Sequence, residues 1–139
     1  MIRAAVIFVL LVVSAHAAVD VDRLVDALRE REEWNGRDGA HGERGPWQIT
    51  PAVWRLHMPG ISFAEARCVA VARACAVKHV NYLAAQLEAR GVAPLLFNIA
   101  LAWNAGINGS TRGTAPERAY HFAVAVENIY HARSRSQLR

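Results

Sequence analysis

The chain has 139 residues, 53% of them hydrophobic, and its 16 lysine and arginine residues against 12 aspartate and glutamate residues give a net charge of +4. This length suits one domain with a sizeable core, which excludes a multidomain enzyme, and the hydrophobic content excludes a disordered chain. The positive charge suits an anionic partner such as a cell envelope, but the arginines are scattered without a run, so ordinary solvation is favoured over a surface for nucleic acid.

The first 17 residues are predicted to be a removable export signal. Arg3 precedes an apolar stretch over residues 4–13, and residues 14–17 (Ser-Ala-His-Ala) end on the small-x-small pattern that signal peptidase cleaves. The apolar stretch is too short to span a bilayer. We therefore expect an exported protein, periplasmic or extracellular, that is not inserted in a membrane once the leader is removed.

Two helices are expected in the first half of the mature chain. Residues 19–33 carry apolar residues at helical spacing and acids near the amino end, where the helix dipole favours them. Residues 35–45 contain four glycines and predict a loop or a tight hairpin. Thr50 as N-cap and Pro51 at the first helical position predict a short helix to about His57.

A long helix is expected over residues 64–89, opened by a capping box at residues 62–65 (Ser-Phe-Ala-Glu) and ended near Gly91. Within such a helix Cys68 and Cys75 would have Cα atoms about 10 Å apart, beyond the reach of a disulfide. The favoured interpretation is two small buried residues on one stripe. The alternative is a break in the helix between them, with a disulfide.

The next helix, residues 95–104, is apolar on nearly every side and is expected to be the buried central one. Residues 107–113 predict a polar loop, and the last helix is expected from about Glu117 to Ala132. The predicted fold is all-α, with one small hairpin at most. It comprises a signal peptide at residues 1–17, a helical domain at 18–133 and a flexible tail at 134–139.

Metal and nucleophile chemistry receive little support from the sequence. No histidine pair has ligand spacing on one helix, so we expect neither a metal site nor another cofactor. Ser62, used as a cap, and Ser110, in a loop, do not sit in a strand-turn-helix elbow, and neither cysteine has a nearby base. The histidines considered are His41, His57, His79, His121 and His131.

The carboxylates are more informative. Continuing the apolar stripe of the first helix from Leu24 and Leu28 by four residues reaches Glu32, an acid at the buried edge of the helix end. A carboxylic acid in such surroundings has a raised pKa and can donate a proton to a leaving oxygen near neutrality. Glu33 and Glu30 are the alternates, since a one-residue shift would exchange their roles, and a solvated acidic helix end is the purely structural alternative.

Two later motifs give this acid a context. Residues 45–49 read Gly-Pro-Trp-Gln-Ile, and residues 102–106, at the end of the buried helix, read Ala-Trp-Asn-Ala-Gly. With the preceding Glu32-Glu33, these segments resemble the lysozyme-like superfamily, specifically the soluble lytic transglycosylase domains. In those domains a helix ends in a catalytic Glu-Ser, and a Gly-Leu-Met-Gln-Ile-like turn and an Ala-Tyr-Asn-Ala-Gly segment follow. The resemblance covers about residues 21–130 and departs at Glu33, which replaces the usual serine.

The resemblance implies a lysozyme-like helical domain that cleaves β-1,4 glycosidic bonds between aminosugars of peptidoglycan. Glu32 would protonate the leaving oxygen and then act as a base toward the 6-hydroxyl of the sugar, giving an anhydro product, or toward water. Gln48 and Asn104 would hydrogen-bond the sugar, and Trp47 and Trp103 would offer apolar faces beside Ile49. For both tryptophans core packing is the alternative, and core packing is favoured for Trp54, Tyr82, Tyr120 and Tyr130.

Three further alternatives stay open. Glu43, in the glycine loop, could be a second carboxylate that activates water, which would make the protein a lysozyme-type hydrolase; pairing with Arg44 or Arg37 is its structural alternative. The chain could also be a cell-wall glycan-binding domain without catalysis, or a small helical protein whose motif match is chance. Peptidoglycan glycan strands are the expected partner, nucleic acid is not, and a monomer is expected.

Overall fold

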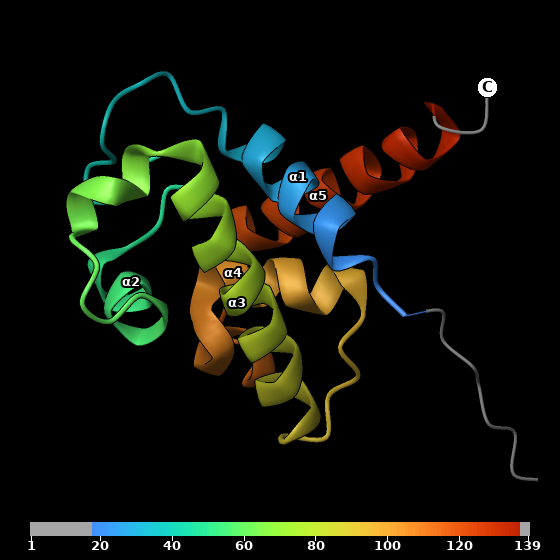
Figure 1. The fold of residues 1–139 in the computed structure, drawn as a ribbon. Helices are drawn as coiled ribbons and strands as arrows, with labels where there is room; N and C mark the ends of the chain where they lie inside the picture. Colours follow the sequence, from blue (N-terminus) through green and yellow to red (C-terminus); the bar gives the residue numbers. More distant parts are fainter. Residues whose placement is uncertain (1–17, 137–139) are drawn as a thin grey trace, which may run out of the picture.

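A computed structural model describes residues 18–136, so the predicted leader and the last three residues lie outside the described part. The all-α prediction is confirmed (Figure 1). Within residues 18–136 the expected hairpin is reduced to one isolated antiparallel bridge between Arg44 and Ile49. The helices are α1 (Val21–Glu32), α2 (Pro51–His57), the 3-10 helix η1 (Phe63–Arg67), α3 (Val69–Glu88), α4 (Leu96–Thr111) and α5 (Glu117–Ser136).

Helix α1 follows the expected stripe. The Asp20 side chain accepts a hydrogen bond from the Arg23 amide and caps the amino end. Leu24 and Leu28 are fully buried, and the helix ends at Glu32 because Glu33 turns into the left-handed conformation with φ of 49°. The stripe therefore delivers Glu32 to the last helical position.

Helix α2 and the end of α3 also form as predicted. The Thr50 hydroxyl accepts from the Val53 amide, and the helix ends at His57. Trp54 is buried, as expected, and its indole donates to the Ile61 carbonyl at 2.8 Å. Gly91, with φ of 71°, takes the left-handed turn that follows α3.

The predicted helix over residues 64–89 is wrong at its amino end. The Ser62 hydroxyl caps only the short η1, and the extended Cys68 (φ −76°, ψ 118°) separates η1 from α3. Cys68 is exposed, Cys75 is buried, and both are free thiols. The break therefore takes Cys68 off the predicted buried stripe without creating a disulfide.

Helix α4 packs against both α3 and α5 (Figure 1). Its core-facing side chains are buried, as expected, but Trp103 is only half-buried, so the helix is not enclosed on every side. The predicted loop over residues 107–113 is wrong in its first part. The chain kinks at Gly106 (φ 75°, ψ 163°) and resumes a helical turn, in which the Ser110 and Thr111 hydroxyls both donate to the Ile107 carbonyl.

Helix α5 runs beyond the expected end at Ala132 and into the predicted tail, because contacts with the start of α1 hold it. The Ser134 hydroxyl accepts from Arg23 at 2.5 Å and donates to the Tyr130 carbonyl, while the Tyr130 hydroxyl accepts from the Asp20 amide. Tyr130 is buried as expected, whereas Tyr82 and Tyr120 are exposed, so for them the prediction of core packing is wrong. No helix within residues 18–136 is both long and apolar enough to cross a membrane.

Candidate active site

Two adjoining cavities, of about 300 and 290 Å³, meet at the carboxyl end of α1. Glu32 and Gln48 line both of them, so together the cavities form one cleft with Glu32 near its middle. The first cavity is also lined by Gly39, Ala40, Glu43, Thr50, Trp103 and Asn104, and the second by Glu33, Trp34, Asn35, Arg37 and Asp38. Two stretches far apart in the sequence therefore supply the cleft: residues 32–50, from the end of α1 through the glycine loop to the cap of α2, and Trp103 and Asn104 of α4.

The carboxyl group of Glu32 is largely removed from water and has an unusual electrostatic setting. Burial raises its pKa from 4.5 to about 7, and the charge of Glu43 adds to this rise. Two groups act in the opposite direction: the Trp103 indole, which donates to Glu32 Oε1 at 3.1 Å, and the positive charge of Arg31. Because burial outweighs both, Glu32 holds a proton about half of the time near neutral pH.

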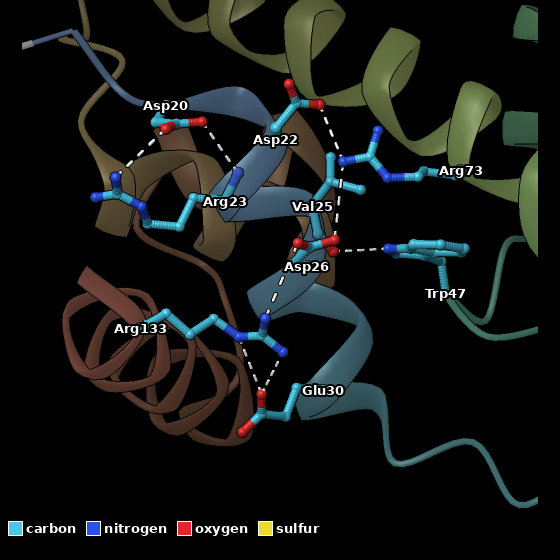
Figure 2. Close-up of polar contacts among 9 residues, drawn as sticks. All are labelled: Asp20, Asp22, Arg23, Val25, Asp26, Glu30, Trp47, Arg73 and Arg133. Carbon is cyan, nitrogen blue, oxygen red and sulfur yellow. Dashed lines mark hydrogen bonds and ion pairs between the residues drawn. The ribbon is translucent and has the colours of Figure 1, made fainter. Parts of the chain in front are cut away.

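The two alternate acids have different surroundings. Glu30 is exposed and accepts from two nitrogens of Arg133, at 2.7 and 3.1 Å, on the side of α1 that faces α5 (Figure 2). Glu33 is an exposed C-cap residue that borders only the second of the two cavities. Neither shares the burial of Glu32, so the acid suited to proton donation is the one that the stripe predicts.

Glu43 reaches the same cavity as Glu32. Its Oε2 accepts from the His41 amide at 2.9 Å, and its carbonyl accepts from the Gly39 amide at 2.7 Å, so the loop itself holds it in place. The expected pairing with arginine is not found in the described part of the chain, where Arg44 lies 3.4 Å from Asp38 instead. Glu43 therefore faces the cleft without a compensating cation.

Gln48 adopts a left-handed backbone conformation, with φ of 47°, which is rare for a residue other than glycine. Its side-chain amide nitrogen, Nε2, donates to the Gly45 carbonyl at 3.0 Å. A Cβ atom on Gly39 would lie 2.8 Å from Gln48 Oε1 and 2.3 Å from Glu43 Oε2. Gly39 thus leaves room for both polar side chains at the cleft, a role that the sequence analysis missed.

Two predicted sugar contacts are wrong. Trp47 is 1% exposed, and its indole donates to the Val25 carbonyl at 2.7 Å, so it anchors the turn to α1 and offers no free face. Ile49 is 2% exposed and belongs to the core. Within residues 45–49 every residue but Gln48 is buried, which leaves Gln48 as the one that faces the cleft.

Trp103 and Asn104 do border the cleft, and a third residue joins them that sequence reasoning missed. Trp34 lines the second cavity, is partly exposed, and donates from its indole to the Arg37 carbonyl at 2.9 Å. Its signal was present in the sequence: a tryptophan directly after the candidate acids, at the start of a polar glycine-rich loop without an apolar stripe.

A larger cavity of about 460 Å³ lies beside the same helix, between α1 and α5. Its lining includes Arg133, which pairs with both Asp26 and Glu30, and Arg29, whose guanidinium lies over the Trp47 ring at 5.5 Å. The side chains of both acids that Arg133 pairs with are exposed and are already neutralised by that cation. We therefore take the cleft around Glu32 as the candidate site.

The sequence predicts no metal site, and the positions of the histidines in the structure are relevant to that prediction. Within residues 18–136 no group of three or more His, Cys, Asp or Glu side chains is placed to hold a metal ion. However, His57 Nε2 and His79 Nδ1 lie 3.0 Å apart. Spacing along the sequence does not indicate this pair, because it joins α2 to α3 rather than two positions of one helix.

The chain matches no protein-family model, no curated protein and no solved structure. The geometry of the cleft and the motifs that surround it are therefore what point to a function.

Proposed function

We propose that this protein is an exported enzyme that cleaves β-1,4 glycosidic bonds between the aminosugars of peptidoglycan, as a lytic transglycosylase. The observation that carries the proposal is the carboxyl group of Glu32, whose pKa burial raises to about 7 and which lies in the middle of an open cleft. A general acid in glycoside cleavage must carry a proton near neutral pH, and this environment provides one.

In the first step Glu32 donates its proton to the glycosidic oxygen as the bond from the sugar C1 to that oxygen breaks. The carboxylate so formed is stabilised by the Trp103 indole, which donates to Oε1. In the second step the Glu32 carboxylate takes the proton of the 6-hydroxyl of the same sugar, whose oxygen bonds to C1. The products are a 1,6-anhydro sugar and a shortened strand, and Glu32 is protonated again.

The remaining polar groups of the cleft suit the recognition of aminosugars. The Gln48 and Asn104 amides can each donate and accept hydrogen bonds with acetamido and hydroxyl groups. Trp103 in the first cavity and Trp34 in the second offer partly exposed aromatic surface on the two sides of Glu32. We propose that a glycan strand runs across Glu32 from one cavity to the other.

Hydrolysis is the second candidate, and Glu43 is the observation that favours it. This carboxylate borders the same cavity, has no ion pair within residues 18–136, and its charge acts on Glu32. It is therefore placed to accept a proton from an attacking water, as the second acid of a lysozyme-type hydrolase does.

Mass spectrometry of the products from purified cell-wall sacculi tests the proposal. Anhydro-muropeptides from the wild-type protein and none from Glu32→Gln would support it, and reducing-end products that disappear in Glu43→Gln would favour the hydrolase instead. No soluble product anywhere from about pH 4 to about pH 8 would overturn catalysis. In that case sedimentation of the protein with sacculi would identify a glycan-binding domain.

A further inference from the structure

His79 is the one polar or charged side chain that is buried within residues 18–136, with 9% of its surface exposed. It lies on α3, and the proposed chemistry does not use it. A buried imidazole loses hydration and must be compensated by a hydrogen bond or by packing. Its surroundings therefore indicate what it does.

Three aromatic side chains surround His79. His57 Nε2 lies 3.0 Å from His79 Nδ1, so one ring donates a hydrogen bond and the other accepts it. Tyr82 stacks on the imidazole, with ring centroids 5.9 Å apart and planes 14° apart. The Trp103 indole contacts it at a centroid distance of 5.3 Å, with the planes tilted by 58°.

Trp103 connects this cluster to the candidate active site. The indole that packs on His79 is the one that donates to Glu32 Oε1 at 3.1 Å. The contacts thus run from α2 through α3 and α4 to the end of α1, in the order His57, His79, Trp103 and Glu32. An indole can hold a useful hydrogen bond only if the plane of its ring is fixed, and His79 is a neighbour that contacts this ring.

We propose that the hydrogen-bonded pair His57–His79 is a positioning unit that orients the Trp103 indole and thereby the carboxyl group of Glu32. Neither histidine lines the cleft or contacts Glu32, and His79 reaches the site only through Trp103, so the two are positioning residues. The inference rests on the proposed function for its effect on catalysis, whereas its structural part, the fixing of Trp103, can be measured without activity.

The chemistry of the pair suits this role. Burial lowers the pKa of His79 to about 4 and also lowers the pKa of His57, and the charge of Lys78, whose Nζ donates to the His57 carbonyl at 3.1 Å, contributes to the shift at His57. Both rings are therefore neutral near pH 7, and one N–H is shared between them. A neutral pair holds the ring of His79 without placing a charge against the indole of Trp103.

The variant His57→Ala tests the inference, because His57 is only partly buried and its removal leaves the core intact. We expect the indole N–H of Trp103, identified by comparison with Trp103→Phe, to exchange with solvent faster, and the pKa of Glu32 measured by NMR titration to rise. This variant replaces none of the three residues that act on Glu32, namely Trp103, Arg31 and Glu43. A rise in the pKa of Glu32 therefore reports a weaker hydrogen bond from the Trp103 indole. We expect kcat on sacculi to fall about ten- to a hundredfold with KM nearly constant.

Two further variants make the test specific. His57→Gln restores a hydrogen-bonding group and should recover most of the Trp103 protection, whereas His121→Ala, which removes an exposed histidine of α5, should change nothing. Unchanged exchange at Trp103 and an unchanged pKa of Glu32 in His57→Ala would overturn the inference. If both change but even the wild-type protein releases no product from sacculi, the positioning unit stands and the proposed function fails.

Discussion

Glu30 and Glu32 lie two residues apart on α1 and have opposite surroundings. Glu30 belongs to a charged seam, shown in Figure 2, in which the acids of α1 meet Arg133 of α5 and Arg73 of α3. Glu32 points the other way, is largely buried, and meets an indole instead of a cation. One helix thus carries carboxylates whose ion pairs tie it to its neighbours and one carboxylate, Glu32, that has no ion pair within residues 18–136.

The two surroundings have opposite effects on the stability of the fold: the ion pairs of the seam stabilise it slightly, and the burial of Glu32 destabilises it. Each pair of the seam is solvent-exposed and contributes at most about 1 kcal/mol, a contribution that salt weakens. Burying Glu32 opposes folding whenever it is ionised, because the ionised group loses hydration without gaining a cation. A buried group that destabilises the fold, in a cavity that has not closed around it, is a candidate for a functional residue.

The largest expected effect is the loss of activity in Glu32→Gln. Glutamine keeps the shape and still accepts from Trp103, but it has no proton to donate to the leaving oxygen, so release of soluble muropeptides should fall about 10²- to 10⁴-fold. The matched control is Glu30→Gln, the same change two residues earlier. Equal losses in both variants would mean that the seam, and not the cleft, supports catalysis.

The same substitution should stabilise the protein at alkaline pH. Because burial raises the pKa of Glu32 from 4.5 to about 7, the folded protein keeps a proton that the unfolded chain releases over this window. The contribution of this proton to the free energy of unfolding is therefore fully present below about pH 4.5, and it is lost progressively as pH rises to about 7. Denaturant unfolding of Glu32→Gln should show a gain of order 2–3 kcal/mol at pH 8 and almost none at pH 4. A gain that is equal at both pH values would contradict this explanation.

Trp103→Phe should change the pH profile more than the fold. The general acid must be protonated, so kcat/KM of the wild-type protein should fall as pH rises through about 7. The indole hydrogen bond favours the charged form of Glu32, so its removal raises the pKa of Glu32. The falling limb of the pH profile therefore moves to higher pH, and the maximal kcat/KM drops about tenfold. In contrast, Trp34→Phe should raise KM and leave the limb in place. A limb that stays fixed in Trp103→Phe would show that the indole does not control the acid.

The smallest effect is expected in the seam. Arg133→Gln removes the pairs with Glu30 and Asp26 and should reduce the free energy of unfolding by about 0.5–1 kcal/mol at low salt, with activity unchanged. In about 1 M salt the wild-type and variant proteins should unfold at nearly the same denaturant concentration. A loss that persists at high salt would point to packing of the arginine stem instead.

Local patterns predicted the helices and the position of Glu32 at the buried end of α1, because a helical period and a capping residue are properties of neighbouring positions. Leu24 and Leu28 placed Glu32 correctly, and Thr50 began α2 where expected. The turn at residues 45–49 was harder, since which side chains face the core depends on backbone angles such as the left-handed φ of Gln48. The pairing of His57 with His79 could not be predicted, because it depends on how α2 packs against α3.

The same limit explains the misplaced start of α3. A capping box indicates that a helix begins, but it does not distinguish a 3-10 turn from an α-helix. The preference for η1 comes from tertiary contact, since Ala66 is fully buried there and its carbonyl lies against Gly45. The sequence of residues 62–65 carries no information about that contact.

The close approach of Gly45 to η1 determines how the cleft can respond to a ligand. A Cβ atom at Gly45 would lie 1.7 Å from the Ala66 carbonyl oxygen, so the base of the loop that carries Glu43 and Gln48 rests directly on another backbone segment. This wall cannot yield without opening the core, so for the glycan strand that we propose as ligand the entropy lost on association falls mainly on the strand. A short oligosaccharide held rigid in its bound shape should therefore bind more tightly than a longer, freely rotating one.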